Sequence, residues 1–418
     1  MLEIYFGKER LFVDNVILTG ATVLAGVLGI VMHSVLSHRL VPRDYGAAFT
    51  VITLLSFLVP ASSWLGLVMA RTVSHALAEN NPVTGSTLLR AGNRQIMLWG
   101  GLVALLVAFT SPLAGNALHL SPVLVVLFAP AIPFTLALPL LTGALQGTQR
   151  FGSVATVFAA QAGLRLVGAT ALGAVWSSAG VIAGITLASL VTYAWAWILV
   201  RDLRHGSGPP AAWRSLVNYS LIIIVSSLLQ AVLLTTDVVV VQHYYSGQLA
   251  GEYSVVAVLG RGLFWISTAI AIVLFPKVVS KEARGLRALG MVAASLALVA
   301  AGGLVVFAVF SLEGRLVLTY FAGRAYIGAA SYMGLYAIAM TLLGLGSVLM
   351  AVHQSRGKPQ FLWVLAAVTV AEPIGIAWFH QGLTEVVATV AVCMAALVVG
   401  MAAILLLEDR RLQLAASP

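Results

Sequence analysis

Apolar segments of about 20 residues or more recur along the whole 418-residue chain, separated by short polar breaks. A helix of that length crosses about 30 Å, the thickness of the hydrocarbon core of a bilayer. Hydrophobic residues make up 60% of the chain and charged residues only 9%, against roughly 25% charged residues in a soluble globular domain. The apolar runs are continuous, whereas a membrane barrel would show short segments of alternating polarity. The sequence therefore predicts an all-α polytopic membrane protein.

Polar breaks divide the apolar runs into twelve predicted transmembrane segments. Turn-forming residues mark the breaks, as in HRLVPRDYG at 38–46 and SRGKP at 355–359. No small-residue cleavage site follows the N-terminal residues, and the first apolar run is too long for a signal-peptide core, so we expect it to remain as the first span. The predicted spans cover residues 11–37, 46–70, 94–114, 122–147, 151–175, 180–201, 213–242, 248–276, 287–311, 326–352, 360–380 and 383–407.

Lysine and arginine are distributed unevenly over the two sides of this arrangement. Seventeen of the 23 basic residues lie in the termini and the even-numbered loops. The odd-numbered loops hold Arg39, Arg43, Arg315 and Arg324, and the spans hold Arg165 and Arg261. By the positive-inside rule, both termini are expected in the cytoplasm. The net charge of +9 then marks the cytoplasmic face and suits anionic lipid headgroups, and it gives no reason to expect a nucleic-acid partner.

The two halves of the chain carry similar segments in the same order. RDYGAAFTVITLLSFLVPASSWLGLVMARTVSHALA resembles LAGEYSVVAVLGRGLFWISTAIAIVLFPKVVSKEA, with Gly46 matching Gly251 and Ser74 matching Ser280. Both copies have the same predicted orientation in the membrane, so we expect parallel repeats of six helices each. The predicted lobes are residues 1–205 and 206–418, which meet near RHGSGPPAAW at 204–213.

Three stretches resemble the polysaccharide-transport branch of the multidrug/oligosaccharidyl-lipid/polysaccharide (MOP) exporter superfamily, the Wzx-like flippases. They are LVPRDYGAAF, GALQGTQRFG and TTDVVVVQHYYSGQLAGEYSVVAVLGRGLFWISTAIAIVLFPKVVS. The resemblance implies a MATE-like fold in the bacterial cytoplasmic membrane, with two pseudo-symmetric six-helix lobes around a central cavity that opens alternately to either side. The implied cargo is an oligosaccharide linked to undecaprenyl diphosphate. The implied partners are membrane lipids, with a polysaccharide polymerase and glycosyltransferases as further candidates.

Arg165 and Arg261 lie near the middle of spans five and eight. A charged residue there costs roughly 2.5–3.5 kcal/mol, so such residues usually face a cavity or a partner. The planar guanidinium fork matches phosphate oxygens, and one arginine comes from each half, so both are candidates for binding the cargo's diphosphate. The alternative is that each arginine holds helices together through a carboxylate or backbone carbonyls. Gln161 and Gln230 share this central layer and are further cavity candidates.

Two acidic residues and one histidine inside the spans are further candidates. Glu372, which precedes Pro373, is a candidate for titration in an ion-coupled cycle, or alternatively for a salt bridge to one of the arginines, Arg165 in particular. Asp237 lies nearer the outer end of its span and is a candidate for binding a coupling cation or gating, or alternatively for a local pairing role. His33 is a cavity candidate, although a histidine in such a position is more often a satisfied polar residue.

Enzymes and drug exporters are the competing classes. The sequence has no nucleotide-binding P-loop, no HExxH and no CxxC, with Cys393 as its one cysteine, so neither a cofactor nor a metal site is expected. A membrane glycosyltransferase or polymerase would need a large polar outer loop, and the longest predicted ones, around 312–325 and 38–46, are short. A MATE-like cation-coupled drug exporter would need an acidic cavity. Two arginines against one glutamate in the central layer favour an anionic cargo.

The predicted topology can be tested by cysteine labelling after replacement of Cys393. We expect Gly206→Cys and Lys281→Cys to react with a membrane-impermeant maleimide only after the membrane is permeabilised, and Arg43→Cys to react in intact cells. Labelling of positions 206 and 281 in intact cells would contradict the assignment of these loops to the cytoplasm.

Overall fold

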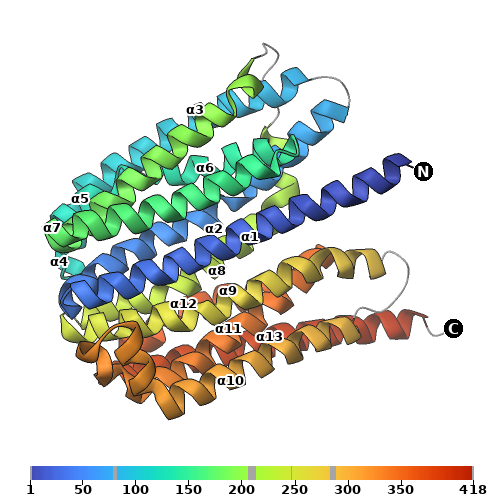
Figure 1. The fold of residues 1–418 in the computed structure, drawn as a ribbon. Coiled ribbons are helices and arrows are strands. Elements are labelled where there is room, and N and C mark those ends of the chain that lie inside the picture. Colours follow the sequence, from blue (N-terminus) through green and yellow to red (C-terminus); the bar gives the residue numbers. More distant parts are fainter. Residues whose placement is uncertain (1, 79–81, 206–212, 246, 283–288, 417–418) are drawn as a thin grey trace. The chain divides into compact units, whose positions relative to one another are not determined.

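A computed structural model describes residues 2–78, 82–205, 213–245, 247–282 and 289–416, and the described residues contain helices and no strand (Figure 1). Among them, eleven helices are long and apolar enough to cross a membrane. This confirms the predicted all-α, multi-pass class. The α-helices are α1 Leu2–Arg39, α2 Pro42–Ala78, α3 Pro82–Phe109, α4 Ser111–Ala117, α5 Pro122–Phe128, α6 Ala131–Gly147, α7 Phe151–Leu199, α8 Trp213–Tyr244, α9 Gln248–Glu282, α10 Leu289–Phe321, α11 Ala330–Arg356, α12 Phe361–Trp378 and α13 Leu383–Ala416, with 3-10 turns η1 Arg201–Arg204 and η2 Arg324–Ala329.

The 49-residue helix α7 contains two of the predicted spans. Its backbone leaves helical geometry at Trp176 and Ser177, where φ of Ser177 is +52°. On either side of this turn, Leu172 lies against Gly180, and Gly168 lies against Gly184. Such pairs are the contacts of two antiparallel arms, so α7 is a helical hairpin. Each of the twelve predicted spans therefore has a helical counterpart among the described residues.

The two arms of this hairpin approach each other more closely than side chains would allow. A Cβ atom on Gly184 would lie 2.3 Å from the backbone of Gly168, and one on Gly168 would lie 2.9 Å from the carbonyl oxygen of Gly184. Small residues permit this close approach. In lipid, where helices gain no hydrophobic attraction from associating, the close packing of their backbones holds them together. The contact holds the first arm, and with it Arg165, in a fixed position against the second.

Polar contacts hold both ends of the hairpin. At the turn, the Ser177 hydroxyl donates to the carboxylate of Asp44 in the first turn of α2. At the opposite end, Arg150 and Asp202 form a two-pronged ion pair, in which Nη1 donates to Oδ1 at 3.0 Å. The hydrogen bonds from Arg150 hold the pKa of the Asp202 carboxyl below its ordinary value. The pair therefore favours the folded form at neutral pH, and this contribution is lost as the pH falls through the lowered pKa.

The chain forms two compact units, Met1–Ser220 and Leu221–Pro418. In the first, α6 packs against α2, α3 and α7. In the second, α11 packs against α9, α10 and α13. The helices α6 and α11 both correspond to the fourth predicted span of their half, so the same span is central in each unit. Residues 206–212 of the predicted junction lie outside the described residues, and the lobes 1–205 and 206–418, with their parallel relation, remain predictions.

Large apolar side chains cover the outside of the helices. Phe109, Leu312 and Trp363 are more than four-fifths exposed. Trp363 and Trp378 lie at opposite ends of α12, about 22 Å apart along the helix, as expected of aromatic residues at the two interfaces of a bilayer. This exposed surface is suited to lipid.

The hairpin contact predicts different effects for two glycines of α7. We expect Gly184→Ala to destabilise the folded protein by about 1–3 kcal/mol, because the added methyl group would overlap the backbone of Gly168. Gly163→Ala is the matched control, since a Cβ atom at Gly163 meets nothing within 4 Å. Thermal unfolding in detergent measures both. Equal melting temperatures for the two variants would contradict the close contact between the arms.

Candidate functional site

Asp237 is the centre of a buried polar cluster in the second unit. It comes from α8 and is 1% exposed. Arg261 of α9 donates from Nη2 to Oδ1 of Asp237 at 2.9 Å. The hydroxyls of Tyr253 and Tyr336 donate to Oδ2 at 3.0 and 2.7 Å. Three donors from two helices therefore satisfy this carboxylate, which would otherwise be very costly to bury.

The local sequence explains how the cluster assembles. Tyr253 and Arg261 are eight residues apart on α9, slightly more than two turns, so they lie on one face of the helix. Gly260 lies on the side of α9 that meets α11, and a Cβ atom there would be 2.4 Å from the ring of Tyr336. The absence of a side chain at Gly260 lets Tyr336 approach. The rings of Tyr253 and Tyr336 then meet edge to face at 5.6 Å.

The pairing of Asp237 with Arg261 changes the charge balance inferred from the sequence. Asp237 lies seven residues from the end of α8, and Arg261 lies thirteen residues from the start of α9, a difference in depth of about 9 Å. The long arginine side chain spans this difference, so residues predicted for separate layers meet. Within the second unit, the charge of Arg261 is neutralised by Asp237. With Asp237 counted, two arginines face two carboxyl groups, so the excess of positive charge inferred from the sequence disappears. Arg165 remains the arginine whose Nε and Nη2 atoms both lack a hydrogen-bond partner among the described residues.

Glu372 lies near this cluster on α12 and is fully buried. Asp237 and Arg261 act on it electrostatically, and it acts in turn on Cys393 of α13. Neither carboxyl oxygen of Glu372 has a hydrogen-bond partner among the described residues. A second carboxyl group thus lies near an arginine that is already paired. Such an unsatisfied group in an apolar interior is costly and is typical of functional positions.

Arg165 occupies the first arm of the α7 hairpin in the other unit and is partly buried. Its Nε and Nη2 atoms are buried and form no hydrogen bond with any described residue. Gln161 lies one turn earlier on the same face. The arrangement leaves a guanidinium with unused donors beside an amide, in a span where such donors are expensive to leave unsatisfied.

Gln230 and His33 have partners within their own units. Gln230 of α8 donates from Nε2 to Oγ of Ser347 on α11 at 2.8 Å. The Nδ1 atom of His33 lies 3.2 Å from the hydroxyl of Tyr45, and its ring meets Phe49 edge to face. These contacts give both side chains a structural role in this conformation. The described residues searched for metal ligands contain no group of three that could hold an ion.

Tyr253, Tyr336 and Ser347 were not predicted as site residues. The available signal was the position of Tyr253 two turns before Arg261 on one helical face, because a tyrosine inside an apolar span needs a partner for its hydroxyl. The packing of α11 brings Tyr336 to Asp237 and Ser347 to Gln230, and no spacing along the chain indicates these contacts.

The two arginines should respond differently to substitution. Arg261→Ala leaves Asp237 buried with its charge unpaired, so we expect a loss of about 3–5 kcal/mol of stability, largely recovered in Arg261→Ala/Asp237→Ala. Arg165→Ala removes no hydrogen bond made by Nε or Nη2 to a described residue, so its melting temperature should stay close to that of the original protein. Thermal unfolding of the purified variants measures these effects. Absence of recovery in the double variant would contradict the assigned pairing.

Solved transporters share this fold. The chain is similar to an inward-facing MATE-family multidrug resistance transporter of the MOP superfamily, with a TM-score of 0.75, 12% identity and coverage of 94% of this chain and 96% of that one. It is also similar to the lipid II flippase MurJ in an inward closed conformation, with a TM-score of 0.73, 14% identity and coverage of 92% of this chain and 86% of that one. The similarity to the eukaryotic MATE transporter AtDTX14 has a TM-score of 0.70, with 12% identity and coverage of 97% of this chain and 96% of that one. No protein-family model matches the sequence, and no curated protein matches it in sequence. The similarity is one of architecture, and the chain has the fold of the MATE-like MOP transporters.

Proposed function

We propose that this protein is a flippase that moves an undecaprenyl-diphosphate-linked oligosaccharide from the inner to the outer leaflet of the bacterial cytoplasmic membrane by alternating access. The observation that carries the proposal is Arg165, a mid-span guanidinium whose Nε and Nη2 have no partner among the described residues. A diphosphate offers the acceptors that these donors lack, in a geometry that suits the guanidinium fork. The fold supports the proposal, because it is shared with a lipid II flippase.

In this proposal, residues of the central layer divide the work. Arg165 and Gln161 contact the diphosphate and the adjoining sugar. Arg261 contributes in states in which Asp237 releases it, and Gln230 and His33 are further cavity positions. Glu372 and Asp237 couple transport to an ion, because an unsatisfied carboxyl beside an ion pair can take up a proton or cation at modest cost.

The proposed arrangement in the membrane follows the distribution of basic residues. Both termini face the cytoplasm, and the lobes 1–205 and 206–418 are parallel repeats on either side of the cavity. The protein is a transporter and not an enzyme, and it needs no cofactor. A polysaccharide polymerase and glycosyltransferases, which consume and supply such a cargo, are its proposed partners beside membrane lipids.

A MATE-like ion-coupled multidrug exporter is the second candidate. One observation favours it: Glu372 is a fully buried carboxyl without a hydrogen-bond partner among the described residues, and such a group suits a lipophilic cation. Two of the structural neighbours described above are MATE transporters. The unused donors of Arg165 favour the anionic cargo.

Flipping of a defined lipid tests the proposal. The protein is reconstituted in liposomes with a fluorescent polyprenyl-diphosphoryl-GlcNAc, and translocation is followed by dithionite quenching. We expect Arg165→Ala to slow flipping about tenfold or more, because charge-assisted hydrogen bonds to the diphosphate are lost, and Arg165→Lys to restore it in part. Arg201→Ala, at an exposed position in the turn η1 that follows α7 in the same unit, is the matched control and should flip normally.

Three outcomes would count against the cargo role. Normal flipping by both Arg165→Ala and Arg261→Ala would exclude the arginines as diphosphate ligands. A loss of stability in Arg165→Ala that is repaired in Arg165→Ala/Glu372→Ala would assign Arg165 to the scaffold. Export of ethidium driven by an ion gradient, without flipping of the lipid, would favour the drug exporter.

A further inference from the structure

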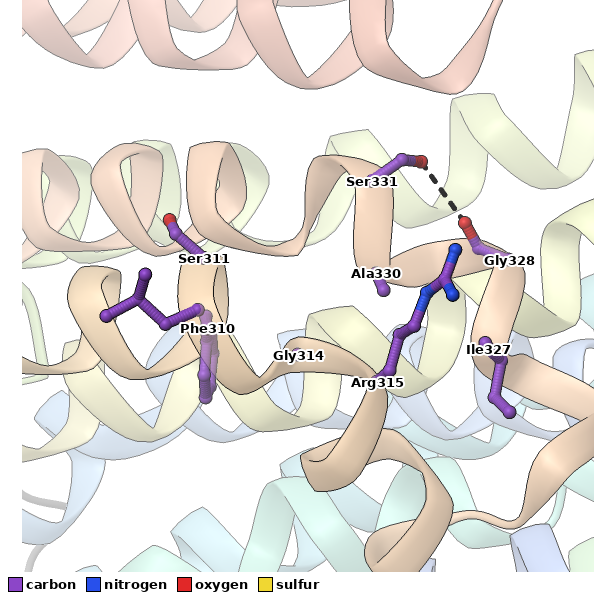
Figure 2. Close-up of a pocket in the computed structure, with 9 residues that line it drawn as sticks. Phe310, Ser311, Gly314, Arg315, Ile327, Gly328, Ala330 and Ser331 are labelled. Carbon is purple, nitrogen blue, oxygen red and sulfur yellow. Dashed lines mark hydrogen bonds between the residues drawn. The ribbon is translucent and has the colours of Figure 1, made fainter.

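A groove opens in the second unit where α10 bends. The backbone of α10 leaves helical geometry at Glu313, with φ −119° and ψ 20°. The bend, the turn η2 and the first residues of α11 enclose a volume of about 350 Å³. Figure 2 shows the residues that line it. This volume is at the small end of the range for ligand sites, and it is large enough for a phosphate-bearing headgroup. The groove lies wholly within the second unit, and none of its lining residues belongs to the cluster around Asp237.

The groove has an apolar floor and a polar mouth. Phe310 is nearly buried at its base, and Ile327 and Gly314 complete the apolar wall. Arg315 extends past the bend toward Gly328 in Figure 2. It is the one charged side chain among the described residues that line the groove.

Serine hydroxyls and a helix terminus accompany Arg315. Ser311 and Ser331 line the groove, and the Ser331 hydroxyl donates to the carbonyl of Gly328 at 3.1 Å. Ala330 and Ser331, the first residues of α11, line the same volume. The carboxylate of Glu252 accepts a hydrogen bond from Gln248 and would lie 2.7 Å from a Cβ atom at Gly328, but Glu252 is not a lining residue. The polar mouth is therefore suited to an anion.

The surface beside the groove is apolar and exposed. Leu312, which also lines the groove, is 81% exposed, and Leu316 and Tyr320 on the same helix are 53% and 78% exposed. In a protein of this class, such residues face the hydrocarbon of the bilayer or its boundary with the headgroups. A ligand entering here meets acyl-chain surroundings on one side and a guanidinium on the other.

We infer that this groove is a binding site for an anionic phospholipid of the surrounding bilayer. The phosphate accepts hydrogen bonds from Arg315 and from the Ser311 hydroxyl, and an acyl chain lies along Leu312 and Phe310. The guanidinium fork matches phosphate oxygens, and partial removal from water strengthens the contact. In the orientation proposed above, this end of α10 belongs to the outer leaflet. The site is separate from the cargo path and holds the bent end of α10 against η2.

Lipid binding to the full-length protein tests this inference. The purified protein in nanodiscs of phosphatidylcholine is titrated with fluorescent phosphatidylglycerol, and with fluorescent phosphatidylcholine as the neutral probe. We expect preferential binding of phosphatidylglycerol, weakened about tenfold in Arg315→Gln. Arg324→Gln is the matched control, because Arg324 is an exposed arginine of η2 that does not line the groove. It should bind as the original protein does.

A second variant tests the groove without changing its charge. A Cβ atom at Gly314 would meet Ala330 and Met333 at 3.6 Å, an ordinary van der Waals contact, so Gly314→Ala is expected to fold and to add a methyl group beside Ala330 of the groove. It should reduce phosphatidylglycerol binding while its melting temperature is kept. Equal reduction in Arg315→Gln and Arg324→Gln would show general surface attraction and overturn the site. Displacement of the lipid by millimolar inorganic phosphate, or by the polyprenyl-diphosphate cargo at equal concentration, would also overturn it.

Discussion

A charge inside the hydrocarbon core of a membrane needs a partner, and this requirement organises the interior of the protein. In the second unit, Asp237 meets it through one guanidinium and two tyrosine hydroxyls. These donors come from α9 and α11, so the carboxylate also ties three helices together. Removing one member leaves the others buried without compensation, which makes such clusters costly to alter. The packing of α11 against α9 and the conformation of Tyr336 depend on the same contact.

Among the described residues, Glu372 and Arg165 are exceptions to this requirement, and the proposed function is placed on them. Both have buried polar atoms that form no hydrogen bond with the described residues. A buried polar group that lacks a hydrogen-bond partner in one conformation can gain one by binding a ligand or a proton, or by a change of conformation. The pairing of Arg261 with Asp237 sharpens this distinction, because it separates an arginine with a structural partner from one without. The argument for an anionic cargo therefore rests on Arg165 more than on the number of arginines.

Close approach of backbones provides the framework in which these side chains are held. Helices in lipid gain little from burying apolar surface against one another, so contact depends on shape. Gly168 and Gly184 allow the arms of α7 to touch, and Gly260 admits the ring of Tyr336 beside α9. The bend of α10 at Glu313 has the opposite effect, since it opens a groove where a straight helix would pack. The same packing rules thus produce both the rigid and the open parts of the second unit.

The sequence by itself determined the class, the number of spans and the residues that need partners, because hydrocarbon thickness and the cost of buried charge act on each segment separately. WSSAG at 176–180 was sufficient to separate spans five and six, which α7 contains as two arms. Tertiary structure alone decided which charges meet. Asp237 and Arg261 differ in depth by about 9 Å, and only the packing of α8 beside α9 and the reach of an arginine side chain bring them together. Tyr336 and the groove at Arg315 depend likewise on how α11 packs, and contacts between distant helices leave no periodic signal in the chain.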